Sequence, residues 1–126
     1  MSTILLVDNE PLQALQLKAL LTRHYCDVQR VADPADALCL VEQPQFAADL
    51  GLVISALSMP GIGGPAFVAE LHERLPDLPI IGMGRRGELS EADTSSWLRY
   101  LPRPFASGQI LALVSELLKS RDREAA

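Results

Sequence analysis

Short apolar runs alternate along the chain with longer stretches in which apolar residues recur every three or four positions. The short runs, bounded by polar residues, glycine or proline, are typical of strands that are buried on both faces. Strands are predicted at residues 4–7, 28–31, 52–55, 79–82 and 99–101. The longer stretches have helical periodicity, and helices are predicted at residues 11–23, 34–43, 64–75, 90–97 and 106–120.

Capping signals support several of these helices. Pro11 stands where a first helical turn accepts proline, and Asp33-Pro34 combines a capping side chain with a proline. The segment Ser90-Glu91-Ala92-Asp93 resembles a capping box. The first helix is predicted to face the core with Leu12, Leu15, Ala19 and Leu20, and Leu17 and Leu21 widen this stripe. The third and last helices are predicted to do so with Phe67, Val68, Leu71, Leu75, Ile110, Leu113, Val114 and Leu117.

The alternation of strand and helix predicts one three-layer α/β/α domain. Each helix carries the chain back across the sheet, so consecutive strands run parallel. Strands that are apolar throughout need helices on both faces of the sheet, whereas the half-polar strand at 28–31 suits an edge. The domain is predicted to span residues 1–120, and the charged segment 121–126 is predicted to be a frayed tail.

Composition narrows the partners of such a domain. The chain has 126 residues and a net charge of −5, so it lacks the basic surface that direct binding of nucleic acid requires. Its N-terminus has no basic region typical of a signal peptide, and no stretch approaches the roughly 20 apolar residues of a membrane span. We therefore expect a cytoplasmic protein without membrane contact. Cys26 and Cys39 are predicted to be buried free thiols.

Function in an open parallel sheet is expected beyond the carboxyl ends of the strands. The segments found there are Asp8-Asn9, Ser55-Ala56-Leu57-Ser58, Met83-Gly84-Arg85 and Pro102-Arg103-Pro104. No glycine fingerprint for a dinucleotide follows the first strand, and no G-x-S-x-G elbow is present. We therefore expect no enzymatic activity and no cofactor. The third strand ends at Ala56, whose methyl group can neither accept a proton, bind a metal nor act as a nucleophile.

Four segments together resemble the receiver domain of two-component response regulators. They read ILLVDNEP, LVISALSMPGIGG, PIIGMGRRGE and YLPRPF, and they follow one another at that family's spacing over essentially the whole chain. The resemblance implies a flavodoxin-like fold with five parallel strands in the order 2-1-3-4-5, flanked by five helices. It also implies phosphorelay signal transduction with a protein partner: a histidine kinase, an output domain or another regulator.

The resemblance assigns chemistry to the strand ends, and most of the residues concerned differ here. In the family an acidic pair helps to hold Mg²⁺, an aspartate accepts the phosphoryl group, and a Ser or Thr and a Lys contact that group. The corresponding residues are Asp8 and Asn9, Ala56, Gly84 and Arg103. Of these only Asp8 keeps the family's residue, while the aromatic that changes rotamer in many members is retained as Tyr100. The chain thus resembles a pseudo-receiver that lacks the phosphoacceptor aspartate.

These changes predict a degenerate phosphoacceptor pocket. Mg²⁺ takes about six oxygen ligands, and a single carboxylate neutralises it poorly, so metal binding is expected to be weak or absent. Arg103 presents a planar fork that matches a carboxylate. We hypothesise that Arg103 pairs with Asp8, with extension of Arg103 into solvent as the alternative. The resemblance also implies a cis bond between Arg103 and Pro104.

The leading functional hypothesis is a protein-interaction module that works independently of phosphorylation. The resemblance places its interaction face, or a homodimer contact, on residues 88–120, with Trp97, Tyr100, Leu111 and Leu118 as candidate contacts. Packing of these side chains within the domain is the alternative.

Two other hypotheses remain open at this point. One is a functional phosphoreceiver with a relocated acceptor, for which Ser55 and Ser58 flank Ala56. The other is a small-anion-sensing module in the emptied pocket. Each applies equally to a separate protein and to the receiver of a longer regulator.

Overall fold

The computed structural model describes residues 3–25, 27–58, 64–85, 87 and 95–125, with side chains described as far as residue 119. Its strands are β1 (Thr3–Val7), β2 (Val28–Val31), β3 (Leu50–Ala56), β4 (Ile80–Gly84) and β5 (Leu98–Pro102). Its helices are α1 (Pro11–His24), α2 (Pro34–Val41), α3 (Pro44–Asp49), α4 (Gly64–Arg74) and α5 (Ser107–Ala125).

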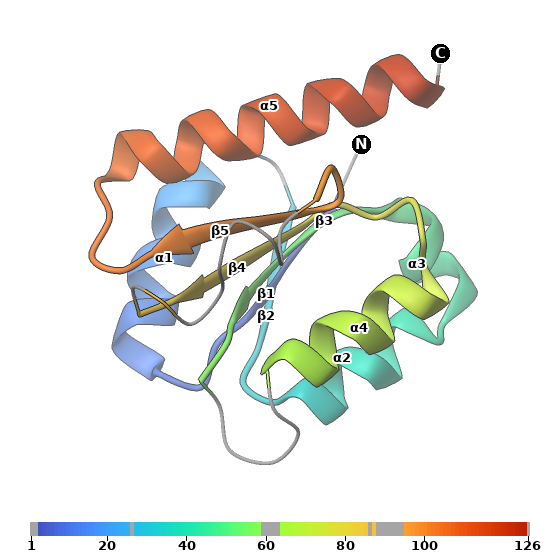
Figure 1. Ribbon diagram of the computed structural model, residues 1–126, viewed down its shortest axis with the longest axis horizontal. Helices are drawn as coiled ribbons and strands as arrows, with labels where there is room; N and C mark the ends of the chain where they lie inside the picture. Colours follow the sequence, from blue (N-terminus) through green and yellow to red (C-terminus); the bar gives the residue numbers. More distant parts are fainter. Residues whose placement is uncertain (1–2, 26, 59–63, 86, 88–94, 126) are drawn as a thin grey trace.

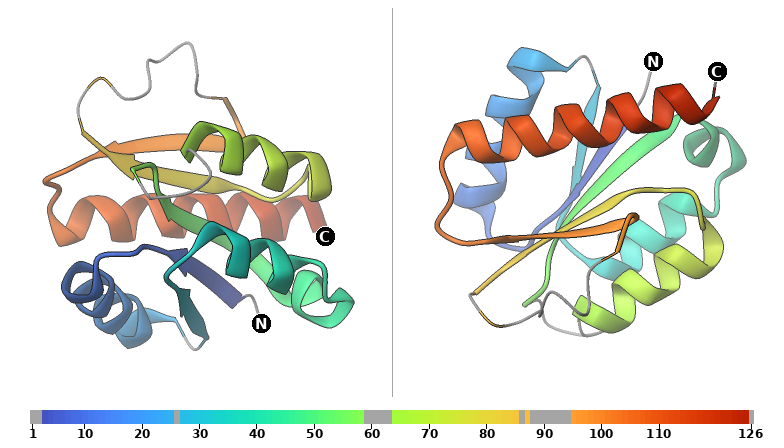
Figure 2. Two further views of the ribbon diagram at one scale, coloured as in Figure 1. Left: turned by 90° about the horizontal axis from the view of Figure 1, so that it is seen from below. Right: turned by 45° about the horizontal axis from the view of Figure 1, so that its top comes forward.

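The strands form one parallel sheet in the order β2-β1-β3-β4-β5 (Figure 1), which confirms the predicted order. Helices α1 and α5 cover one face, and α2, α3 and α4 cover the other (Figure 2). The half-polar strand β2 lies at the edge, as predicted. No helix within the described part of the chain has both the length and the apolar character needed to cross a bilayer.

Alternate residues of the strands supply two separate cores, because neighbouring side chains in a strand point to opposite faces. In β1, Leu5 and Val7 pack towards α2 and α4, whereas Ile4 and Leu6 pack towards α1 and α5. All five residues of β1 and all seven of β3 are buried. This double burial explains why these strands are apolar almost throughout.

The predicted core face of α1 is right in part: Leu17 and Leu21 are buried and Leu20 packs against the core, whereas Leu12, Leu15 and Ala19 are exposed. The buried residues of this helix are Ala14, Leu17 and Leu21, while Leu12 and Leu15 are 67% and 65% exposed. The exposed residues Leu12 and Leu15 have the same helical spacing as the buried Ala14, Leu17 and Leu21. Because leucines occur almost all round the helix, periodicity alone could not decide which face is buried. The structure buries the face with the small Ala14 against the sheet and leaves two leucines in solvent.

Several boundaries also differ from the prediction. The short helix α3 was not expected and leads directly into β3, which starts at Leu50. Helix α5 ends at Ala125, beyond the predicted end at residue 120. The helix predicted at 90–97 falls largely outside the described residues, and its last three, 95–97, are not helical. Cys39 is exposed rather than buried, and Cys26 lies outside the described residues.

Candidate functional site

The carboxyl ends of β1, β3, β4 and β5 meet at one edge of the sheet, towards the lower left of Figure 1. They bring together the predicted pocket residues Asp8, Asn9, Ala56, Gly84 and Arg103. A cleft of about 360 Å³ opens there, and it is called the strand-end cleft below. Its walls include Asn9, Glu10, Ser58, Met83, Gly84 and Arg103.

Asp8 lies just after β1 and is almost completely buried, with 1% of its surface exposed. One carboxylate oxygen, Oδ1, accepts a hydrogen bond from the Glu10 backbone N–H at 3.1 Å. The other, Oδ2, accepts one from Nη2 of Arg103 at 3.0 Å. A carboxylate this deeply buried needs such partners, because an unpaired charge in the interior is costly.

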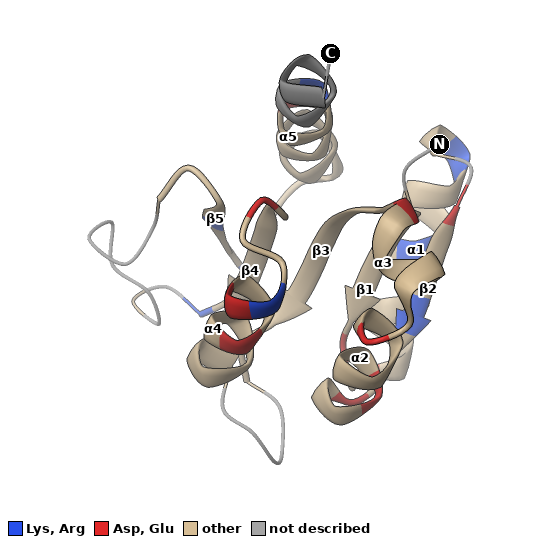
Figure 3. Cartoon of the chain, turned by 90° about the vertical axis from the view of Figure 1, so that its right-hand side faces the viewer, with Lys and Arg blue, Asp and Glu red and all other residues tan. Residues whose placement is uncertain are grey.

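Arg30, on the edge strand β2, also holds Asp8, although not through its carboxylate. Its Nε and Nη2 donate to the Asp8 carbonyl oxygen at 3.1 and 2.8 Å. Figure 3 shows basic positions on β2 and α1 and acidic positions on α2. Sequence reasoning missed this contact. The available signal was a polar residue in the strand that pairs directly with β1.

Arg103 follows β5, and its side chain extends along the carboxyl ends of the strands to reach Asp8, just after β1. Its backbone N–H donates to the Gly84 carbonyl at 2.7 Å, which anchors the residue beside the end of β4. Its side chain is 30% exposed and also lies 3.8 Å from the sulfur of Met83. The hypothesis that Arg103 pairs with Asp8 is therefore confirmed, and extension into solvent is excluded. The Arg103–Pro104 bond is cis, as the resemblance implied.

The end of β3 offers a buried methyl group and two differently placed hydroxyls. Ala56 is 3% exposed. Ser55 is fully buried, and its hydroxyl donates to the Ala56 carbonyl oxygen at 2.9 Å, so this hydroxyl is engaged in a local contact. Ser58 is exposed and lines the strand-end cleft. Gly84 contributes backbone only, where the resembling family has a hydroxyl.

Sterics explain why the last residue of the segment LVISALSMPGIGG, Gly64, is a glycine. Gly64 opens α4, and a Cβ atom added there would collide with the backbone of Leu57, just after β3. The first turn of α4 thus lies directly against the end of the strand that forms the cleft. Any side chain at position 64 would push the helix away from it.

The predicted interaction residues are all partly buried. Leu111 and Leu118 pack against the core between α1, α5 and the sheet. Tyr100 and Trp97 pack against the core on the opposite face. These positions favour packing within the domain as the principal role of all four side chains. Part of the predicted face, residues 88–94, lies outside the described residues.

Sequence reasoning also missed the partner of Trp97. The His72 ring of α4 stacks on the Trp97 ring with 3.7 Å between centroids and 8° between planes. This contact joins α4 to the residue that precedes β5. His72 and Trp97 are 25 positions apart in the sequence, so no local pattern indicates the pair.

Comparison with known proteins agrees with the geometry. The profile of the response regulator receiver domain family matches residues 4–115. The sensor kinase CckA of Brucella abortus (strain 2308) is 29% identical over 125 residues, which cover 96% of this chain but only 13% of that kinase. The chain therefore corresponds to a small part of this relative.

Solved structures share the fold over nearly the whole chain. A response regulator receiver protein from Sinorhizobium medicae WSM419 superposes with a TM-score of 0.83 at 25% identity, covering 95% of this chain and 96% of that one. A response regulator receiver domain protein from Clostridium thermocellum superposes with a TM-score of 0.87 at 18% identity, covering 97% and 98% of the two chains. Because the family match runs from β1 into α5 and includes the whole strand-end cleft, the chain belongs to the response regulator receiver domain family of two-component signalling.

Proposed function

We propose that this receiver domain is a pseudo-receiver, a protein-interaction module of two-component signalling that works without aspartyl phosphorylation. One observation carries the proposal: the carboxylate of Asp8 is paired with Arg103 beside a β3 end that carries only the buried methyl of Ala56. The partner would be a histidine kinase, an output domain or another regulator. Contact through residues 88–120, including self-association, is one form that this interaction can take.

This cleft offers few of the oxygen ligands that Mg²⁺ requires. The ion takes about six oxygens in near-octahedral geometry and is usually held by one or two carboxylates with water or phosphate. Both oxygens of Asp8 already accept hydrogen bonds, one of them from a guanidinium. The side chain of Asn9 can offer only a neutral amide oxygen, and the side chain of Ala56 offers none. We therefore expect no resident metal in this cleft.

Acceptance of a phosphoryl group would also lack its reacting atom. Attack on phosphorus needs an oxygen nucleophile, and the methyl of Ala56 has none. Gly84 has no hydroxyl with which to contact a transferred group. Ser58 is exposed and lines the cleft, so it is the residue on which the alternative, a relocated acceptor, would depend.

Phosphoryl uptake can be tested directly by mass. The purified chain would be incubated with acetyl phosphate and Mg²⁺, and the intact mass would be measured without acid treatment. We expect no adduct. The matched control carries Asn9→Asp, Ala56→Asp, Gly84→Thr and Arg103→Lys, which rebuilds the four altered positions and should gain one phosphoryl group.

Two outcomes would contradict the proposal. A stoichiometric adduct on the unaltered chain would refute phosphorylation independence, and its loss in Ser58→Ala would identify a relocated acceptor. A partner that binds the chain only after such an adduct forms would refute it as well. Affinity capture followed by mass spectrometry, with and without acetyl phosphate, distinguishes these cases because the proposed module should retain the same partner in both.

A further inference from the structure

A second, larger groove lies outside the strand-end cleft, between α1 and the segment that joins β5 to α5. It has a volume of about 490 Å³, within the range of roughly 300–1,000 Å³ that small-molecule sites occupy. We call it the α1 groove. Arg103 and Gln13 border both hollows, so these two residues lie between them.

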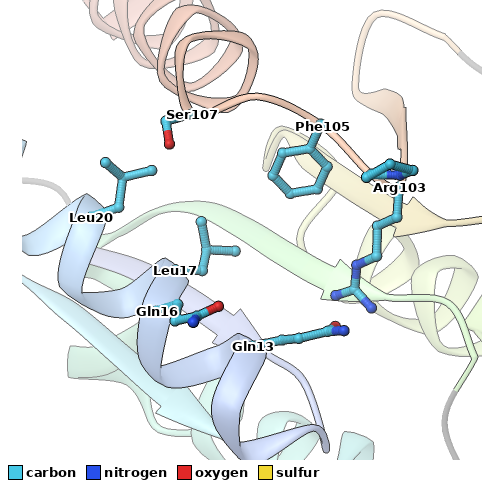
Figure 4. A pocket seen from close by; sticks show the side chains of 8 residues that line it. Gln13, Gln16, Leu17, Leu20, Arg103, Phe105 and Ser107 are labelled. Atoms are coloured by element: carbon cyan, nitrogen blue, oxygen red, sulfur yellow. The ribbon is translucent and has the colours of Figure 1, made fainter.

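The α1 groove has an apolar floor. Leu17 belongs to the core beneath it, and Leu20 and Phe105 are partly buried against the same core. Figure 4 shows Leu17, Leu20 and Phe105 pointing into one shared space, with Arg103 at its far end. An alkyl chain or aromatic ring in this space would replace water on apolar carbon, which is favourable in proportion to the area covered.

The rim of the groove is neutral or positive. Gln13 and Gln16 contribute amides, and none of the eight lining residues is acidic. Arg103 is the only charged side chain among them. The one charge on this lining is positive, which favours a ligand with one negative end.

Arg103 retains donors for a second anion. A guanidinium has five N–H groups, and Asp8 and Met83 contact only those on Nη2. Within the described part of the chain, Nε and Nη1 of Arg103 hold no hydrogen bond. The side chain is also 30% exposed, so a carboxylate can reach these atoms while Nη2 stays on Asp8. Figure 4 shows the guanidinium extending towards the end of Gln13 at the mouth of the groove.

We propose that the α1 groove binds a small amphiphilic carboxylate, with its apolar chain on Leu17, Leu20 and Phe105 and its carboxylate on Arg103. This site goes beyond the proposed interaction function and does not depend on it. The chain has a negative net charge and repels anions at long range. A small anion without an apolar chain should therefore not bind to the groove. Each methylene that enters the groove should raise affinity by about threefold to fourfold, from about 0.8 kcal/mol per buried CH₂.

The test is a titration of the isotope-labelled chain with octanoate below its micelle concentration, followed by amide chemical shifts in NMR. Saturable shifts are expected at Gln13, Gln16, Leu20 and Phe105. Hexanoate should bind roughly tenfold more weakly than octanoate, because it lacks two methylenes, and acetate should not bind. Octanol, which has the same chain without the charge, should bind at least tenfold more weakly than octanoate.

Variants separate the two halves of the site. Arg103→Gln should weaken octanoate at least tenfold and leave octanol unchanged, whereas Leu20→Gln should weaken both. Leu15→Ser, on the exposed face of the same helix, is the matched control and should change neither. Because Leu20 is only partly buried, its variant keeps the test available if Arg103→Gln does not fold.

Three results would overturn the proposal. The first is equal affinity for octanoate and octanol, which would remove the role of Arg103. The second is a set of shifts centred on the exposed Leu12 and Leu15, which would indicate adhesion to an apolar surface. The third is the absence of any saturable shift with octanoate.

Discussion

Replacing Arg103 by glutamine is expected to leave the Asp8 carboxylate inside the protein without its charged donor. Asp8 is 1% exposed with Arg103 in place, so the carboxylate relies on the guanidinium and the Glu10 N–H rather than on bulk water. The Glu10 N–H would remain as a donor to the carboxylate. The variant should therefore fold, with a lower free energy of unfolding.

The expected loss of unfolding free energy in Arg103→Gln depends on how deeply Arg103 and Asp8 are buried. Removing one partner of a fully buried ion pair costs about 3–5 kcal/mol, whereas exposed pairs contribute about 0–1 kcal/mol. Arg103 is 30% exposed, and solvent screening of its side chain lowers the expected loss to about 2 kcal/mol. With a urea m-value of about 1–3 kcal/mol per molar, this is a fall of roughly 1 M in the unfolding midpoint.

A double-mutant cycle with Asp8→Asn isolates the interaction. Urea unfolding of the four proteins at pH 7 should give a coupling energy of about 1–2 kcal/mol. The chain offers a matched control in the pair Arg74–Glu42, which has the same 3.0 Å distance but side chains 36% and 65% exposed. Its coupling should stay below about 0.5 kcal/mol. Equal coupling energies for the two pairs would refute the argument that burial, rather than distance, makes the Arg103 contact strong.

Three further experiments, with five substitutions in all, test the packing. Gly64→Ala should cost about 2–3 kcal/mol in urea unfolding because its Cβ meets the backbone after β3, whereas Gly108→Ala has open space around its Cβ and should change stability by less than about 1 kcal/mol. His72→Ala should cost about 1 kcal/mol and shift the fluorescence of the single tryptophan to the red, since the ring stacked on it is lost; an unchanged spectrum would contradict the stack. Leu15→Ser should be neutral within about 0.5 kcal/mol and Leu21→Ala should cost about 2–5 kcal/mol, and the reverse order would contradict the burial of Leu21 and the exposure of Leu15.

The layered fold was predictable because burial on both faces leaves a clear trace in sequence. Residues 4–7 and 52–55 are uninterrupted apolar runs, or nearly so, and both lie inside fully buried strands. Prolines at positions 11 and 34 mark the starts of α1 and α2 correctly. The order of the strands in the sheet is not encoded by any periodicity of the sequence. It was predicted from the family resemblance alone.

The features that sequence could not supply depend on choices made in three dimensions. Two stripes of α1 have the same spacing, and only packing against the sheet selects the one with Ala14. The contact of Arg30 with the Asp8 carbonyl joins residues 22 positions apart, across two strands. The pairing of Arg103 with Asp8 and a solvated Arg103 side chain are both compatible with the sequence, because a sequence does not reveal whether a guanidinium turns inward.

The altered residues of the strand-end cleft are best understood together, as a balance of charge. Asn9 and Ala56 each replace an acidic residue of the receiver family, so the cleft has two negative charges fewer. One carboxylate, that of Asp8, remains in the buried part of the cleft. Arg103 supplies the single positive charge that this carboxylate needs, at 3.0 Å, so the pair is neutral without an ion. Restoring aspartate at position 56 alone would then add a buried charge with no partner, a costly change in a protein interior. On the proposed function, phosphoryl uptake should therefore return only when several positions change together. The single Ala56→Asp variant should be less stable than the parent chain and gain no metal-dependent adduct, and a stable single variant that labels with acetyl phosphate and Mg²⁺ would disprove this balance.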